Sequence, residues 1–168
     1  MPSLRTISAA YSAALEIGVV GAEEVIAWVD SVIEKTPEPP YPLIEASLAG
    51  RDRNLLIREL KEVPGDLDEA TRRRLLFGLM HRAFLRDQGL AAAITRHLFM
   101  MGVDGDAPDE KAIGVMLSLD DGLDLAQAGV YGTTKEVLLE LEAFLSQHGS
   151  VPESRSGQAG SIYTTTQV

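Results

Sequence analysis

The chain has 168 residues, no cysteine and a formal net charge of −10 at pH 7, with 45% hydrophobic and 24% charged side chains. Its length fits one folded domain with a sizeable core, and the lack of cysteine excludes disulfides, thiolate zinc sites and a cysteine nucleophile. The negative charge argues against nucleic acid as a partner, because binding to phosphates depends on lysine and arginine.

The N-terminal stretch bears on localisation. It lacks the continuous apolar run of a signal peptide, and no apolar stretch of the sequence approaches the roughly 20 residues that span a bilayer. We therefore expect a cytoplasmic protein without a membrane partner, for which a chain without cysteine is well suited.

The first part of the chain predicts a series of amphipathic helices. Apolar residues recur at helical spacing between Ser3, a candidate N-cap, and Gly18, a candidate helix stop, and they recur again over residues 21–35. The closely spaced prolines of TPEPPYP then interrupt the chain. Residues 42–65 predict two short helices, each closed by Gly or Pro-Gly, with Asp52 as the cap of the second.

The longest helix is predicted over residues 66–89, with Asp66 or Asp68 as its cap. Its centre, LLFGLM, is apolar nearly all round, which predicts the most buried helix of the fold. This helix also carries the basic cluster of the chain, which we interpret as a solvated face that pairs with nearby carboxylates. The cluster consists of Arg72, Arg73, Arg74, Arg82 and Arg86. A further helix is predicted over residues 90–102.

The stretch GVDGDAPDE, residues 102–110, predicts a joint between helices. Gly102 is expected to end one helix and Asp106 to cap the next, with Asp109 and Glu110 in its positively polarised first turn. A calcium-binding EF-hand is excluded here, because valine stands where that loop requires a bidentate glutamate.

Two capping boxes are predicted in the C-terminal third, where a hydroxyl and an acid reach toward each other's backbone. The first is formed by Ser118 and Asp121, and the second by Thr133 and Glu136 at the start of the last helix. The polar residues 150–168 predict a flexible tail.

No period of two indicates strands, so the predicted fold is all-α. We expect a single-domain antiparallel helical bundle, or a short helical-pair array, of about seven to nine helices over residues 1–149. The tail, residues 150–168, follows this domain.

The motif DDGLD, residues 120–124, resembles the DDxxD signature of isoprenoid synthases. In that all-helical family, the carboxylates bind magnesium ions that bridge to a diphosphate, so the resemblance implies an Mg²⁺-dependent enzyme acting through Asp120 and Asp124. The second acidic motif of the family is missing. The local alternative is a negatively charged first helical turn.

No other motif indicates catalysis or a cofactor. His81 and His97 lack the partners at i+3 or i+4 that form a helical metal pair, and His148 suits a last helical turn. The sequence also lacks a nucleophile elbow, a phosphate loop and a dinucleotide fingerprint. We therefore expect no catalytic residue, no metal and no cofactor.

The stretch EIGVVGAEEVIAWVDSVIEKTPEPPYPLIEASLAG, residues 16–50, resembles the opening of small uncharacterised helical bacterial proteins. Some of these are encoded beside toxins and treated as immunity proteins. The shared elements are a helix ending in Ile-Gly, the EEVIAWVD helix, and the PPYPLIEASLAG helix after a proline break. The resemblance implies a binding protein and transfers no site residues.

The negative charge is concentrated in one part of the chain. Residues 1–100 contain 12 basic and 14 acidic side chains, whereas residues 101–148 contain 2 basic and 10 acidic ones. A surface of one sign steers a partner of the opposite sign. The predicted partner-binding residues are Asp104, Asp106, Asp109, Glu110, Asp120, Asp121, Asp124, Glu136 and Glu140.

The leading hypothesis is thus a non-enzymatic acidic helical binding protein for a basic protein partner, of which an immunity-type inhibitor is one instance. The first alternative is the Mg²⁺-dependent enzyme acting on a diphosphate. The second is a scaffold that self-associates into a homo-oligomer without ligand chemistry.

Overall fold

The computed structural model describes residues 1–151, and these contain eight α-helices, one 3-10 turn and no strand. The predicted all-α fold is therefore confirmed. The helices are α1 Leu4–Ile17, α2 Ala22–Lys35, α3 Tyr41–Ser47, α4 Arg53–Lys61, α5 Glu69–Arg86, α6 Ala91–Val103, α7 Glu110–Gln127 and α8 Thr134–His148, with the 3-10 turn η1 at Gln88–Leu90. Most of the predicted tail, residues 152–168, lies outside the described residues.

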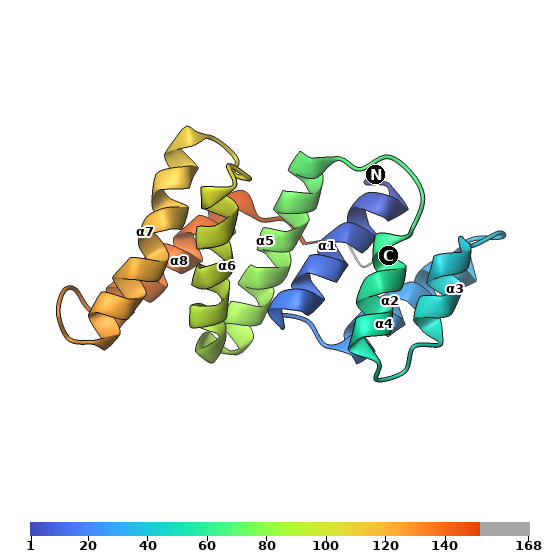
Figure 1. Cartoon of the computed structure of the whole chain (residues 1–168), viewed down its shortest axis with the longest axis horizontal. Coiled ribbons are helices and arrows are strands. Elements are labelled where there is room, and N and C mark those ends of the chain that lie inside the picture. Colours follow the sequence, from blue (N-terminus) through green and yellow to red (C-terminus); the bar gives the residue numbers. More distant parts are fainter. Residues whose placement is uncertain (152–168) are drawn as a thin grey trace, which may run out of the picture.

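The helices form an elongated array, as Figure 1 shows. In its middle, α5 packs against α1 on one side and against α8 on the other. The array continues from α1 to α4, and α3 contacts both α4 and α2. At the opposite end, α7 packs against both α6 and α8. The loop between α7 and α8 and the short helix α3 therefore lie at opposite ends of the molecule.

Local side-chain chemistry fixes where several helices begin. The side chains of Ser3, Asp52 and Asp68 each accept a hydrogen bond from a backbone N–H in the first turn of α1, α4 and α5, respectively. Thr133 and Glu136 form the predicted reciprocal capping box at the start of α8. These caps are confirmed, and Asp68 rather than Asp66 is the cap of α5.

All eight helices contribute to one cluster of buried apolar side chains. Every residue from Leu75 to Met80 is buried, which confirms α5 as the central helix. After α8, the chain crosses α5 at Gly78, and the backbone N–H of Ser150 donates a 2.9 Å hydrogen bond to the carbonyl of Arg74. Within residues 1–151, no helix is both long and apolar enough to cross a membrane.

The joint between α6 and α7 corrects two predictions. Helix α6 does not end at Gly102. This glycine is buried inside α6, where its missing side chain allows close packing against α7. The N-cap of α7 is Asp109, which accepts a 2.8 Å hydrogen bond from a first-turn N–H. Asp106 does not cap a helix, because its carboxylate is bound by Arg72 and Arg73 on α5.

The predicted capping box of Ser118 and Asp121 was also wrong. α7 runs without interruption from Glu110 to Gln127, so Ser118 lies inside a helix. Its hydroxyl donates a 3.0 Å hydrogen bond to the carbonyl of Val115, three residues earlier. The motif was misleading because a Ser-x-x-Asp spacing also occurs within a helix whose length is set by burial of its apolar face.

Candidate functional site

The nine carboxylates predicted to bind a partner fall into two groups in the structure. Four of them are engaged within the molecule, namely Asp106, Asp109, Asp120 and Glu136. The other five are exposed and make no ion pair or side-chain hydrogen bond within residues 1–151. These are Asp104, Glu110, Asp121, Asp124 and Glu140.

Asp106 fixes the α6–α7 joint to α5. One carboxylate oxygen lies 2.6 Å from Nη2 of Arg72, and the other lies 2.7 Å from Nη1 of Arg73. Both arginine side chains are only 15% exposed. Burial opposes ionisation of Asp106, but the hydrogen bonds and positive charges of Arg73 and Arg72 outweigh it and lower the pKa of this carboxyl below its ordinary value of 3.8.

Asp120 holds α7 against α6. It accepts a 3.1 Å hydrogen bond from the hydroxyl of Thr95, which is fully buried, and it lies 3.4 Å from Nη1 of Arg96. One acid of the DDxxD-like motif thus contacts an arginine, while Asp124 faces solvent. Because the Arg96 guanidinium occupies one carboxylate oxygen, Asp120 acts in this structure as a contact between helices.

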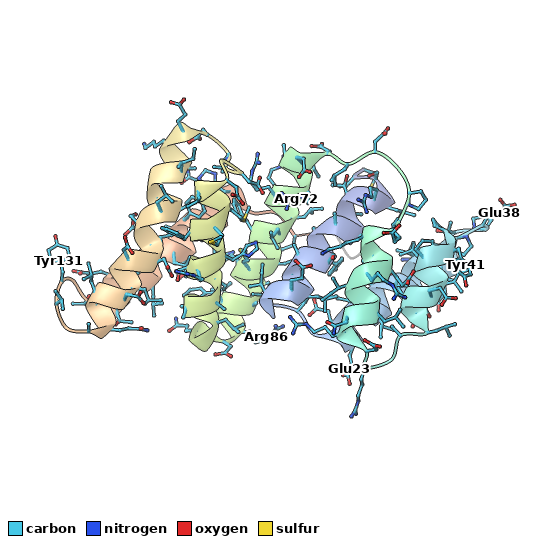
Figure 2. All side chains as sticks on the ribbon, viewed as in Figure 1. Glu23, Glu38, Tyr41, Arg72, Arg86 and Tyr131 are labelled. Carbon is cyan, nitrogen blue, oxygen red and sulfur yellow. The ribbon has the colours of Figure 1, made fainter. Side chains whose placement is uncertain are left out.

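Three of the five arginines in the basic cluster of α5 pair with carboxylates, as predicted, namely Arg72, Arg73 and Arg82. Figure 2 shows Arg72 and Arg86 toward opposite ends of this helix. Arg72 also lies 2.6 Å from Glu69, and Arg82 pairs with Glu24 of α2. The prediction of a solvated face is wrong for Arg72 and Arg73, since the α6–α7 joint covers them.

The three histidines lie on three different helices. Burial lowers the pKa of His97, in agreement with the prediction of a packed side chain. The Nε2 atom of His81 is buried without a hydrogen-bond partner in the described chain, 3.9 Å from Glu142. His148 packs against Phe144 with ring centroids 4.7 Å apart. Among residues 1–151, no three His, Asp or Glu side chains are grouped as metal ligands would be.

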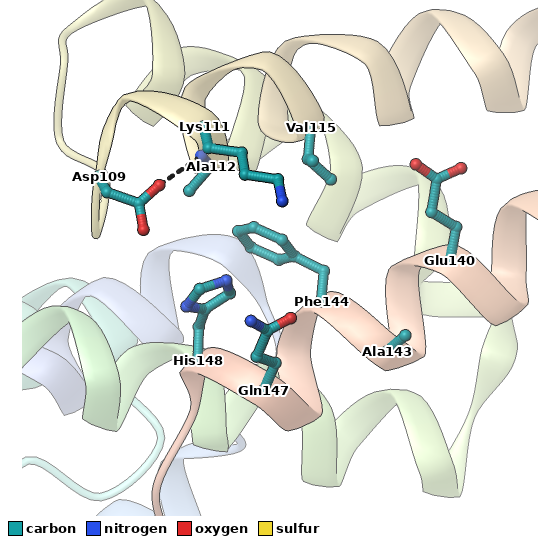
Figure 3. Close-up of a pocket in the computed structure, with 9 residues that line it drawn as sticks. All are labelled: Asp109, Lys111, Ala112, Val115, Glu140, Ala143, Phe144, Gln147 and His148. Atoms are coloured by element: carbon teal, nitrogen blue, oxygen red, sulfur yellow. Dashed lines mark hydrogen bonds between the residues drawn. The ribbon is translucent and has the colours of Figure 1, made fainter.

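A shallow pocket of about 230 Å³ lies between the start of α7 and the end of α8 (Figure 3). Lys111 reaches over Phe144 from α7, with His148 on the other side of the ring. The N-terminus of α7 would favour an anion, but the carboxylate of Asp109 already occupies it as the N-cap. Glu140 adds a second negative charge to the lining, so the pocket does not offer an anion site.

The loop between α7 and α8 carries two exposed apolar residues that sequence reasoning missed. Val130 is 70% exposed and Tyr131 is 78% exposed. Figure 2 shows Tyr131 projecting from the end of the array. The sequence signal for this loop was the stretch GVYG, in which a glycine stands on each side of the two residues. In the structure, both glycines have φ near +70°. The sequence alone does not reveal whether such a valine and tyrosine face the core.

No family model, curated protein or solved structure matches this chain. The resemblance of residues 16–50 to proteins of immunity type therefore stays a prediction. What the protein does has to be inferred from the chemistry of its own surface.

Proposed function

We propose that this protein is a non-enzymatic binding protein that docks a basic protein partner against the exposed carboxylates of α7 and α8. The observation that supports the proposal is the division among the acids. Asp106 and Asp120 have basic partners on α5 and α6, whereas Asp121, Asp124 and Glu140 have no such partner in the described chain.

The balance of charge around these acids favours attraction of a cation from solution. Over residues 101–148, the basic side chains are Lys111 and Lys135 alone, against ten acids. The field of such a surface extends about one Debye length, roughly 8 Å at physiological salt, and accelerates association with a basic protein. The interaction is therefore expected to weaken as the salt concentration rises.

A cytoplasmic inhibitor of a cationic toxin domain is one instance of such a protein. The resemblance of residues 16–50 to bacterial proteins of immunity type supports this narrower form. The acids assigned to binding lie outside the resembling segment, so the electrostatic proposal stands independently of it.

The test compares two triple variants with the same change in net charge. The first, Asp121→Asn/Asp124→Asn/Glu140→Gln, neutralises the surface on α7 and α8. The second, Glu34→Gln/Glu38→Gln/Glu62→Gln, neutralises three exposed acids of the α2–α4 end that also have no ion pair in the described chain. Each protein is used as bait in cells of the source organism, and the captured proteins are quantified by mass spectrometry.

We expect the first variant to lose a basic protein that the wild type and the second variant both retain. Equal losses with both variants would indicate an effect of net charge without a defined surface. An unchanged set of captured proteins with both variants would contradict the proposal.

A further inference from the structure

Within residues 1–151, three helices end in the same hydrogen-bonded turn. α1, α6 and α7 are each followed by a glycine of left-handed conformation, with φ of 89°, 73° and 70° at Gly18, Gly105 and Gly129. In each turn, the N–H after the glycine donates to the carbonyl five residues earlier, at 3.0, 2.9 and 2.9 Å, respectively. The glycine N–H also donates to the carbonyl three residues earlier. This is the Schellman arrangement of a helix C-terminus.

The residue that follows the glycine has a different environment in each turn. After α1 it is Val19, which is 1% exposed and belongs to the core. After α6 it is Asp106, which pairs with two arginines of α5. After α7 it is Val130, which remains largely exposed. The first two turns thus attach a loop to the body of the protein, and the third does not.

The Schellman turn itself explains only part of the third loop. An apolar contact of Val130 with Leu125 is expected in this motif, yet both side chains remain partly or largely exposed. The motif gives no role to Tyr131, whose side chain is more exposed than that of Val130. We call Leu125, Val130 and Tyr131 the apolar tip.

The backbone of the apolar tip is held on both sides. Val130 and Tyr131 both donate to the carbonyl of Leu125, at 2.9 and 3.4 Å. The capping box of α8 begins two residues after Tyr131, where the N–H of Thr133 donates to Glu136 at 3.1 Å. A loop with fixed backbone loses little conformational freedom when it binds, which favours affinity.

Carboxylates precede and follow the apolar tip along the chain. Asp124 directly precedes Leu125, and Asp121 lies one turn earlier on α7. On the other side, the carboxylate of Glu136 lies beside Gly132, the residue after Tyr131. Exposed apolar side chains with a charged rim are typical of protein interfaces, in which tyrosine is a frequent anchor.

We propose that the apolar tip binds a cationic amphipathic helix of the partner protein, with Tyr131 as its anchor and Asp121 and Asp124 facing the cations. This inference rests on the proposed function and adds the partner's apolar face. Charge complementarity distinguishes this occupant from a second copy of the chain, because a symmetric contact through the tip would place carboxylates opposite carboxylates.

The experiment uses two synthetic helical peptides as probes. One has leucine on one face and lysine on the other, and the second carries the same lysines with glutamine in place of leucine. Binding of each to the full chain is measured by isothermal titration calorimetry. The variant is Tyr131→Ala, and its matched control is Tyr41→Ala, which removes a 69% exposed tyrosine from α3 at the other end of the molecule.

We expect Tyr131→Ala to weaken binding of the leucine-lysine peptide about tenfold or more, as loss of an anchoring tyrosine does. Tyr41→Ala should leave this binding unchanged. The glutamine-lysine peptide should bind more weakly to the wild type and should not distinguish it from Tyr131→Ala. A loss with Tyr41→Ala alone, or no loss with either variant, would overturn the inference.

The Asp121→Asn/Asp124→Asn/Glu140→Gln variant separates the two proposals. If it weakens binding while Tyr131→Ala does not, the result supports the proposed acidic surface and contradicts the role of the apolar tip. If Tyr131→Ala weakens binding while the triple variant does not, the electrostatic proposal fails instead. A wild-type dimer in sedimentation equilibrium that Tyr131→Ala dissociates would assign the tip to self-association and overturn its role in partner binding.

Discussion

At its base, the α7–α8 hairpin is fixed to α5 by ion pairs, aromatic packing and a backbone contact, whereas apolar side chains face solvent at its tip. Asp106 pairs with two arginines of α5, and the Phe144 ring of α8 lies 5.5 Å from that of Phe77. Ser150 crosses the same helix. At the other end, Val130 and Tyr131 lack an equivalent contact.

Acids that hold the fold also differ from acids that are free to bind, and both kinds occur at the base. Sequence position does not make the distinction, since Asp104 and Asp106 are two residues apart and only the second is paired within residues 1–151. At the base, Asp106 and the N-cap Asp109 stabilise the fold, and nearer the tip Asp120 and Glu136 do so as well. The exposure of Val130 and Tyr131 in the apolar tip, and of Asp121 and Asp124 before it, unpaired in the described chain, has no such role in the fold.

The largest effect on the base is expected from Gly78→Ala. A Cβ atom at this position would lie 2.1 Å from the carbonyl oxygen of Ser150, so either α5 or the crossing segment would have to shift. We expect the free energy of unfolding to fall by about 3 kcal/mol, the upper range for overpacking. Urea denaturation followed by circular dichroism measures this change.

Gly114→Ala is the matched control for Gly78→Ala. Gly114 is an exposed glycine inside α7, and a Cβ atom there would have no neighbour within 4 Å. Alanine should stabilise this helix by up to about 1 kcal/mol. Equal effects of the two substitutions would show that the crossing at Gly78 does not constrain the base.

A smaller loss, about 2 kcal/mol at neutral pH, is expected from Asp106→Asn. The substitution removes the negative charge between Arg72 and Arg73 while keeping a side chain of similar shape. Asp104→Asn is the control, because this neighbouring acid is exposed and has no ion pair in the described chain. A loss of similar size with both variants would contradict the structural role of Asp106.

The pH dependence of the same variant tests the sign of the effect. The pKa of Asp106 is lowered in the folded state, so the unfolded chain binds the proton more readily. Its contribution to stability is full above the ordinary pKa of 3.8 and is lost as the pH falls through the lower folded value. The wild type should therefore lose more stability than Asp106→Asn on acidification below pH 4, measured by denaturation across that range.

Helix positions could be predicted because the signals that set them are local. Caps such as Ser3, Asp52 and Thr133 act on the N–H group three residues later, and the apolar period of α5 is contained in its own sequence. Asp106 was misassigned because its arginine partners stand 33 and 34 positions earlier in the chain. The residues next to Asp106 in the sequence are equally compatible with a helix cap and with an ion pair.

The apolar tip was missed for a related reason. Gly18-Val19 and Gly129-Val130 have the same sequence and the same turn, yet only the first valine is buried. The difference arises because Val19 lies under the neighbouring helices in the core, whereas Val130 lies at the end of the array. Exposure of a residue after a helix is thus decided by tertiary position, which the turn motif does not encode.

The smallest effect on stability is expected in the two Schellman turns that follow α6 at the base and α7 at the tip. Gly105→Ala and Gly129→Ala both place a Cβ atom on a left-handed backbone, and neither Cβ meets a neighbour within 4 Å. Each should reduce the free energy of unfolding by about 1 kcal/mol, because the strain is in the backbone. Thermal denaturation of the two variants checks that they are alike.

The two variants should differ in binding of the leucine-lysine peptide. Gly105→Ala strains a turn whose next residue is held by α5, while Gly129→Ala strains the turn that orients Val130 and Tyr131. Weaker binding for Gly129→Ala alone, at equal stability, would show that the tip depends on its fixed backbone. Equal binding by both variants would mean that Tyr131 binds the peptide without a preorganised backbone. Base and tip would then differ only in the contacts of their side chains.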